Sequence, residues 1–505
     1  EGDFHEAINV AAVWELPVIF VIENNGYGLS TPNNEQFKCE KFSDKGIGYG
    51  IDAYTIDGNN IVEVFNKVSE IKEQMLIDSK PVILECMTFR MRGHEEASGT
   101  KYVPKEMLNE WSKKDPVVRY EDFLISKKII DNDTIHNIKN EIKKEIISEW
   151  DIADNEGPIQ PTIDCEINDV YSLKSYKHYS ASTKLTNKRF VDAISDALFQ
   201  SMQKHENLII MGQDIADYGG VFKITDGFVK EFGKERIRNT PICESVILSA
   251  GLGLSINGLK SVIEMQFADF VSSGFNAIVN NLAKTHYRWG ENVDVVVRMP
   301  TGGGVAAGPF HSQSNESWFT HTPGLKVVYP AFPSDAKGLL ISSINDPNPV
   351  MFFEHKALYR SISAHISNDY YSIAIGKANL IKEGNDVSII TYGMGVHWAI
   401  EVLNQNKKIN ADLVDLRTLV PLDEETIFNS VKKTGKVIVL HEDCMLGGFG
   451  ADIAFLINEN CFEYLDAPIA RASSLNTPVP FSPKLENQFL PKKRFEDKLF
   501  ELLAY

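Results

Sequence analysis

Apolar runs of strand length alternate with helical patterns along most of the chain. The run at residues 16–22 is too short to cross a bilayer and too evenly apolar for a strand with one wet face, so it predicts a strand inside a sheet that helices cover. Residues 81–87 predict a second strand. Isoleucines at helical spacing from Ile135 to Ile146 predict an amphipathic helix, capped at Asn132 or Asp133, that packs at the edge of its domain.

The alternation of apolar and polar positions disappears at about residues 151–186, where a polar sequence containing Pro and Ser predicts a linker. A second α/β pattern follows, with a helix at residues 187–205 and a strand at 208–212, and a third begins near Asn385. The predicted fold class is therefore α/β with three parallel-sheet domains. Their predicted bounds are residues 1–150, 187–365 and 366–505.

Composition narrows the class of protein. The chain has 505 residues, is 43% hydrophobic, which suffices for several cores, and carries a net charge of −18. This acidic balance argues against nonspecific binding to nucleic acid or to an anionic membrane surface. The six cysteines are scattered without a CxxC pair, so neither a zinc site nor a disulfide framework is predicted. No run of transmembrane length and no signal peptide is visible, and we expect the cytoplasm or an organelle matrix.

Polar residues follow both strands of the first domain. Asn24 and Asn25 end the first strand at the edge where open α/β sheets bind ligands, and Tyr27 follows between two glycines. Amide and carbonyl oxygens there suit Mg²⁺, although an isolated Asn-Gly is more often a simple turn. Arg90 and His94 lie in a basic loop after the second strand. They could donate to a diphosphate, or the loop could simply be solvated.

A second group of polar residues lies in the middle of the chain. Glu244 follows a Thr-Pro pair and begins an apolar, glycine-studded helix, where a carboxylate is also stabilised by the helix dipole alone. Phe270 ends a strand-like segment and could be an ordinary core aromatic. The glycine-rich run at 302–308 leads to His311 in a His-Ser-Gln sequence. It lacks the lysine of a P-loop.

These motifs together resemble a known family. The chain resembles the thiamine-diphosphate-dependent decarboxylating components of 2-oxo acid dehydrogenases. The resemblance lies in the sequence of residues 1–17, the Asn-Asn-x-Tyr turn, the Thr-Pro-x-x-Glu motif and the His-Ser-Gln motif. Residues 1–150 resemble the α subunit without its N-terminal part, and residues from 187 onward resemble the β subunit. The chain thus looks like a fused αβ component with the thiamine-diphosphate-binding fold, nearest to the branched-chain (2-oxoisovalerate) enzymes.

The resemblance assigns roles in the first domain. Asn25 and the carbonyl of Tyr27 would bind Mg²⁺, and Arg90 and His94 would contact the cofactor diphosphate, with His94 bordering the active site. A further Mg²⁺ ligand, the Asp of a Gly-Asp-Gly motif, would precede Glu1, so the printed sequence is predicted to be a fragment. Some relatives also hold a structural K⁺, which would match Ser343, Asp346 and Asn348.

In the second domain, the resemblance makes Glu244 the carboxyl partner of the cofactor's aminopyrimidine N1′, the group that lets this ring remove the proton from thiazolium C2. Phe270 would stack on the aminopyrimidine, and Ile242 and Gln266 would contact it. His311 would bind substrate and handle a proton during acyl transfer.

The implied activity is oxidative decarboxylation of a 2-oxo acid, with reductive acylation of the lipoyl domain of a dihydrolipoyl acyltransferase core in a multienzyme complex. A homodimer resembling an α2β2 tetramer is the expected assembly. Pyruvate or acetoin dehydrogenase is the alternative, because Glu23 stands where branched-chain relatives carry Arg. A transketolase-like ketol transferase and a catalytically incomplete binding subunit also remain open.

Overall fold

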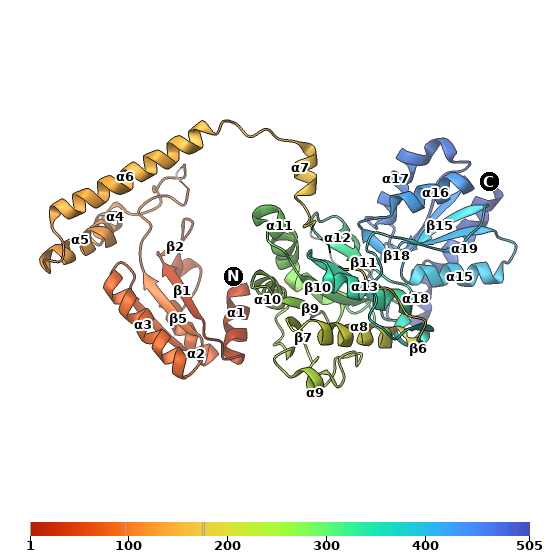
Figure 1. The fold of residues 1–505 in the computed structure, drawn as a ribbon, viewed down its shortest axis with the longest axis horizontal. Helices are drawn as coiled ribbons and strands as arrows, with labels where there is room; N and C mark the ends of the chain where they lie inside the picture. The colour runs from red at the N-terminus through yellow and green to blue at the C-terminus, as the bar shows by residue number, and fades with distance from the viewer. Residues whose placement is uncertain (1, 96, 174, 176) are drawn as a thin grey trace. The chain divides into compact units, whose positions relative to one another are not determined.

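The computed structural model describes residues 2–95, 97–173, 175 and 177–505. The chain divides into two compact units, Glu1–Pro161 and Thr162–Tyr505, each with its own sheets and core (Figure 1). In the described part of the chain, no helix combines the length and the apolar character that a membrane span requires. The predicted α/β class is confirmed by both units.

The first unit is built on a three-stranded parallel sheet in the order β1-β5-β4. Its strands are β1 (Ile19–Asn24), β4 (Asp52–Asp57) and β5 (Val82–Met87). Its helices are α1 (Gly2–Val13), α2 (Lys45–Tyr49), α3 (Ile61–Ile77), α4 (Lys105–Ser112), α5 (Pro116–Ser126) and α6 (Asn132–Asn155). The central strand β5 is buried along its first five residues, and its Leu84 packs with Ile71 of α3 in the core. The predicted second strand is confirmed.

The predicted burial of the first strand is wrong within this unit. β1 lies at the edge of the sheet, and Val21 is 54% exposed. An evenly apolar run indicates a strand but does not reveal how many neighbours it has. Among the described residues of this unit, β5 alone pairs with β1.

The predicted amphipathic helix is α6, but its cap is Asp131, whose side chain accepts a hydrogen bond from the Thr134 amide (2.8 Å). The capping residue precedes the first helical turn, and Asn132 and Asp133 already lie within that turn, so neither of them is the cap. Ile142 and Ile146 are 50% and 60% exposed, so the expected packing is not found along this part of the helix within the unit.

The second unit contains a seven-stranded sheet in the order β17-β11-β12-β10-β9-β7-β8, in which β17 alone is antiparallel. Its strands are β7 (Leu208–Gly212), β8 (Ile237–Asn239), β9 (Lys260–Glu264), β10 (Val295–Thr301), β11 (Lys326–Val328), β12 (Val350–His355) and β17 (Thr418–Val420). The strand predicted at 208–212 is confirmed.

Helices cover both faces of this sheet. α8 (Phe190–Lys204) and α13 (Pro333–Asn345) pack together on one face, in a core that includes Val262 and Val296. α10 (Glu244–Ile256) lies over Ile263 and Val295, the next residues along the same strands, which point to the opposite face. Gly251 permits this close approach, because a Cβ there would meet the Ile263 side chain.

A five-stranded sheet in the order β14-β16-β15-β18-β19 completes the second unit. Its strands are β14 (Asn379–Lys382), β15 (Val387–Thr391), β16 (Ala411–Asp415), β18 (Val437–Cys444) and β19 (Ala470–Ser474). Its helices include α15 (Met394–Gln405), α16 (Glu424–Thr434), α17 (Gly450–Cys461), α18 (Pro483–Phe489) and α19 (Lys492–Ala504). β17 lies between β16 and α16 in the sequence but pairs with β11 of the seven-stranded sheet. This part of the chain therefore connects the two sheets.

The predicted linker contains the end of α6, a short helix α7 (Ile163–Asn168) and a stretch that belongs to the second unit and hydrogen-bonds to the rest of it. The amide of Ser182, for example, donates to Oγ of Ser367 (3.0 Å). β6 (Leu185–Arg189) then pairs antiparallel with β13 (Ser363–Ser367). The helix predicted from residue 187 therefore begins later, at Phe190, because pairing with β13 holds residues 187–189 in a strand.

Candidate active site

Asn24 fixes the turn that follows β1. Its buried side chain donates from Nδ2 to Oε1 of Glu85 (2.7 Å), and its Oδ1 accepts from the Gly26 amide (3.1 Å) and from Asn33 Nδ2 (2.7 Å). Burial works against the charge on Glu85, yet hydrogen bonds from Asn24, backbone amides and Thr55 hold the pKa of this carboxyl below its usual range. Both the oxygen and the nitrogen of the Asn24 side-chain amide therefore have hydrogen-bond partners, and the residue has a structural role.

Asn25 has a different environment. It is half-buried, its Oδ1 accepts from the Tyr27 amide (3.0 Å), and both residues line a cavity of about 720 Å³ beside β1. Neutral amide and carbonyl oxygens at this place fit the donor set predicted for Mg²⁺. The described residues contain no cluster of three or more His, Cys, Asp or Glu side chains suited to a metal.

Arg90 lies against the same turn. Its Nη2 donates to the carbonyl of Leu29 (3.0 Å) and to the Tyr102 hydroxyl (3.1 Å), and its Nη1 lies 3.4 Å from Nδ1 of the exposed His94. Its Nε is buried and has no hydrogen-bond partner among the described residues. A guanidinium with a donor to spare at the carboxyl end of parallel strands fits an anion such as a diphosphate. The structure therefore brings Asn25, Tyr27, Arg90 and His94 to one edge of the first sheet.

The residues predicted to bind the aminopyrimidine and the substrate follow strands that end at one edge of the seven-stranded sheet, because β7, β8, β9 and β10 are parallel. Glu244 begins α10 after β8, Gln266 and Phe270 follow β9, and His311 lies in the loop after β10. Sequence reasoning missed Gln213, which follows β7 and donates from Nε2 to Oε1 of Glu244 (3.2 Å). The available signal was a polar Gln-Asp pair directly after a buried strand.

Three aromatic rings pack together at the carboxyl edge of the seven-stranded sheet, where Glu244 also lies. The His311 ring meets Phe267 edge-on (centroids 4.9 Å apart) and Phe270 in the same manner (5.6 Å). Phe270 is only half-buried, so it is not an ordinary core aromatic. Gln266 donates to Oδ2 of Asp214 (3.0 Å), and Ile242 is 83% exposed. The structure thus brings His311 and Phe270 together and leaves Ile242 open at the surface of the unit.

A buried ion network stiffens this edge. Arg298 of β10 pairs through Nε and Nη2 with both oxygens of Glu354 on β12 (2.7 Å each), and through Nη1 with Glu264 on β9 (2.6 Å). Tyr359 donates to Glu354 as well (2.7 Å). Burial alone would lower the pKa of Arg298, but the two carboxylates raise it above its usual value. The network ties together the strands that carry Gln266, Phe270 and His311.

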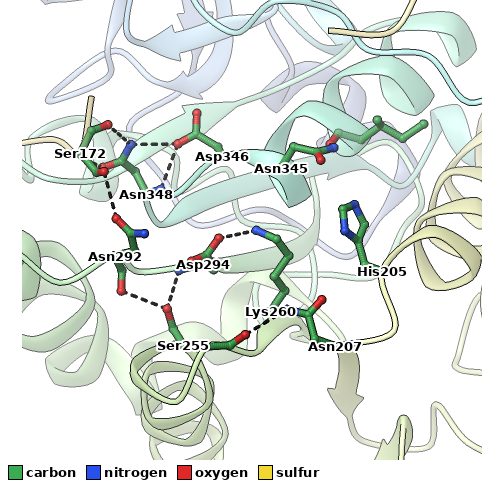
Figure 2. Close-up of polar contacts among 12 residues, drawn as sticks. Ser172, His205, Asn207, Ser255, Lys260, Asn292, Asp294, Asn345, Asp346 and Asn348 are labelled. Atoms are coloured by element: carbon green, nitrogen blue, oxygen red, sulfur yellow. Dashed lines mark hydrogen bonds and ion pairs between the residues drawn. The ribbon is translucent and has the colours of Figure 1, made fainter. Parts of the chain in front are cut away.

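The predicted potassium ligands are already engaged. Ser343 Oγ donates to the Leu339 carbonyl (2.8 Å), and Asp346 receives the ammonium group of Lys326 (2.6 Å). Figure 2 shows Asn348 between Asp346, to which its Nδ2 donates (2.9 Å), and Ser172, whose amide donates to its Oδ1 (2.8 Å). The Lys326 ammonium therefore already supplies a positive charge beside Asp346, and potassium binding at this turn stays a prediction.

Comparisons with known proteins agree with this architecture. Residues 1–162 match the family model for the dehydrogenase E1 component, residues 187–361 the transketolase pyrimidine-binding domain, and residues 376–494 the transketolase C-terminal domain. A split-gene transketolase, solved as an inactive beta4 tetramer, shares the fold with a TM-score of 0.53 at 21% identity, over 63% of this chain and 98% of that one.

Two curated relatives are similar at the level of sequence. The 2-oxoisovalerate dehydrogenase subunit beta of Bacillus subtilis is 42% identical over 306 residues, 60% of this chain and 94% of the relative. The pyruvate dehydrogenase E1 component subunit beta of Staphylococcus aureus is 42% identical over 307 residues, with the same two shares covered.

The fold and the edge of the seven-stranded sheet define an α/β enzyme with transketolase-type pyrimidine-binding and C-terminal domains. The chain belongs to the E1 components of the 2-oxo acid dehydrogenases and joins the E1 dehydrogenase segment and the transketolase-type segments in one polypeptide. It is an oxidoreductase, and its family implies thiamine diphosphate as the cofactor.

Proposed function

We propose that this enzyme decarboxylates a branched-chain 2-oxo acid and transfers the acyl group to the lipoyl arm of a dihydrolipoyl acyltransferase. The observation that carries the proposal is the convergence of Glu244, Phe270 and His311 at one sheet edge, with Gln213 hydrogen-bonded to Glu244. A carboxylate and an imidazole can hold or transfer protons, and an aromatic face can stack on a heterocycle, so this set suits a protein that binds and orients thiamine diphosphate.

Bound thiamine diphosphate supplies an acceptor for the electrons that departing CO₂ leaves behind. Glu244 holds a proton at the aminopyrimidine N1′, and Gln213 orients the carboxyl group that does so. Phe270 offers its face to the pyrimidine ring, with Gln266 and Ile242 around it. The protein side chains in this proposal thus position the cofactor or hold a proton, and the cofactor itself supplies the electron acceptor.

In this proposal the first unit supplies the residues that bind the cofactor diphosphate. Asn25 and the Tyr27 carbonyl hold Mg²⁺, while Arg90 and His94 donate to the phosphate oxygens. The buried Nε of Arg90, without a partner in the described structure, supports this assignment. A homodimer resembling an α2β2 tetramer is the assembly that we propose for the working enzyme, in the cytoplasm of a bacterium or in an organelle matrix.

His311 binds the 2-oxo acid and serves the second half of the reaction. The electron pair that departing CO₂ leaves on the substrate carbon would reduce the lipoyl disulfide: this carbon forms a bond to one sulfur, the S–S bond breaks, and the other sulfur takes up a proton to become a thiol. The carbon would then be released from the cofactor as the thioester, with loss of its hydroxyl proton. His311 delivers the proton to that second sulfur. Its ring is held edge-on by Phe267 and Phe270, which supports a fixed role.

Pyruvate is the second candidate substrate, because Glu23 stands where branched-chain relatives carry Arg. The test compares kcat/KM for 2-oxoisovalerate and pyruvate, with CO₂ release and acylation of a lipoyl domain as readouts. A single methyl group changes discrimination only by about 10–200-fold, so both substrates must be titrated fully. Ketol transfer to a sugar phosphate without a lipoyl domain would indicate a transketolase-like activity, and cofactor-independent binding of the acyltransferase with no turnover would indicate a binding subunit.

A further inference from the structure

The loop that carries His311 has no regular secondary structure and needs partners for its backbone. It runs from the end of β10 to α12 (Ser317–Thr320) and begins at Gly302, which has φ +88°. A Cβ at Gly302 would collide with the His355 ring, so only glycine fits there. Lys356 donates to the Gly302 carbonyl (2.7 Å), and Thr301 donates to the Gln313 carbonyl (2.7 Å). These contacts fix the two ends of the loop.

The middle of the loop is held by a carboxylate from a distant part of the chain. Glu486 lies in α18 and is 2% exposed. Its Oε1 accepts from the Gly304 amide (2.8 Å), and its Oε2 accepts from the Ala306 amide (3.0 Å). Each oxygen of Glu486 therefore serves one backbone donor of the loop, an arrangement that an amide side chain cannot reproduce.

A second carboxylate acts from β18. Glu442 Oε1 accepts from the Gly303 amide (2.6 Å) and from Ser314 Oγ (3.3 Å), while its Oε2 lies 2.6 Å from Nε2 of His355. Burial opposes its charge, yet His355 and the Gly303 amide hold the pKa of Glu442 below its usual range. Glu442 thus remains an acceptor at neutral pH and links the start and the end of the loop to the C-terminal sheet.

We propose that Glu442 and Glu486 are positioning residues for the active site: through the amides of the glycine-rich loop they fix His311. The C-terminal domain thereby contributes to the acyl-transfer half of the reaction without touching substrate. This inference rests on the proposed role of His311. Buried charge-assisted hydrogen bonds to backbone amides are strong and directional, so they suit a loop that must hold one imidazole in place.

The test compares Glu486→Gln with wild type in two separate half-reactions. Decarboxylation is followed with a dye as the electron acceptor, and acyl transfer is followed by mass spectrometry of a lipoyl domain. In Glu486→Gln the side-chain NH₂ must face a backbone N–H, so we expect acyl transfer to fall by about tenfold or more. Dye-coupled decarboxylation at saturating 2-oxo acid should fall much less, whereas the KM for the 2-oxo acid should rise, because His311 also binds this substrate in the proposed function. The matched control is Glu459→Gln, at an exposed position of α17.

Hydrogen–deuterium exchange supplies a readout that does not depend on turnover. The peptide covering residues 302–314 should exchange about tenfold faster in Glu486→Gln, because two backbone amides lose an acceptor. Glu442→Gln can keep its oxygen on the Gly303 amide and place its NH₂ toward His355, so it should show a smaller effect. It also serves as the test if Glu486→Gln fails to fold.

Three results would overturn the inference. The first is faster exchange of the loop with unchanged acyl transfer, since the carboxylates would then anchor the loop without positioning His311. The second is an equal loss in both half-reactions that follows the fall in thermal midpoint. The third is exchange at the wild-type rate. If the wild-type enzyme itself fails to acylate a lipoyl domain, the proposed function fails instead, and the two failures remain distinguishable.

Discussion

The side-chain amide of Gln213 donates to Oε1 of Glu244 over 3.2 Å, across the carboxyl ends of the neighbouring strands β7 and β8. This contact orients the carboxyl group on which the proposed chemistry depends. It comes from two elements that are separated by a helix and a loop in sequence, so the parallel sheet is what brings them together.

Replacing Glu244 by Gln should lower the exchange of the cofactor's C2 proton by about 10²–10⁴-fold, because the variant loses a positioned acid–base group. Proton NMR of bound thiamine diphosphate measures this rate directly. Glu231→Gln, at an exposed position of α9 (Phe228–Phe232), is the matched control. Unchanged exchange in Glu244→Gln, with circular dichroism like that of wild type, would refute the assigned role.

Gln213→Ala should slow the same exchange more mildly. A hydrogen bond to a charged group contributes about 1.5–3 kcal/mol, and part of this is recovered by water, so a loss of about tenfold is expected. The KM for thiamine diphosphate should change little, because Gln213 acts on Glu244. A loss as large as that of Glu244→Gln would mean that Gln213 contacts the cofactor itself.

The buried Glu316 should make stability depend on pH. Burial and the nearby charge of Asp443 raise its pKa to about 8, and Tyr392 donates to its Oε1 (2.8 Å). The folded pKa lies above the unfolded one, so this group's contribution to stability is fully present at acidic pH and is lost as pH rises toward 8.

Glu316→Gln should therefore reduce the fall in thermal midpoint between acidic and mildly alkaline pH. One proton changes the free energy of unfolding by at most about 1.4 kcal/mol per pH unit. Thermal denaturation of both proteins at several pH values measures the difference. A parallel fall in wild type and variant would contradict the raised pKa.

Arg298→Met should destabilise the protein by about 3–5 kcal/mol, because Glu264 and Glu354 would be left buried without a counter-charge. Chemical denaturation followed by fluorescence gives the change. Arg189→Met removes an exposed pair with Asp192 and should leave stability near that of wild type. If the two variants behave alike, the buried network does not stabilise the sheet edge as described.

Exchange of KCl for NaCl should leave the thermal midpoint unchanged. The ammonium of Lys326 lies 2.6 Å from Oδ2 of Asp346, and the backbone amide of Ser172 donates to Oδ1 of Asn348. These side chains therefore have charge and hydrogen-bond partners within the protein. A rise of several degrees in K⁺ alone would show that the site binds potassium through other atoms, such as backbone carbonyls.

The strands and the local motifs could be predicted from sequence, since each depends on residues close together in the chain. The strand at residues 208–212 and the central strand of the first unit are examples. Long-range relationships could not be predicted. The edge position of β1 depends on which strands surround it, and Glu486 lies 182 residues from Gly304, whose amide it binds.

The site shows the same division. Glu244, Phe270 and His311 were identified through the motifs that contain them, and the structure brings Phe270 and His311 into contact. Gln213, Glu442 and Glu486 were missed because each acts on a segment that is distant in sequence. The potassium ligands were assigned from a turn whose side-chain partners, Lys326 and Ser172, lie elsewhere in the chain.

The antiparallel pairing of β17 with β11 limits where the polypeptide can be divided. Truncation between the seven-stranded and five-stranded sheets would strip β11 of its outer neighbour and bare a row of peptide groups next to an apolar core. Such exposed sheet edges promote aggregation, so a shortened protein that ends there should precipitate even though its own strands are all present.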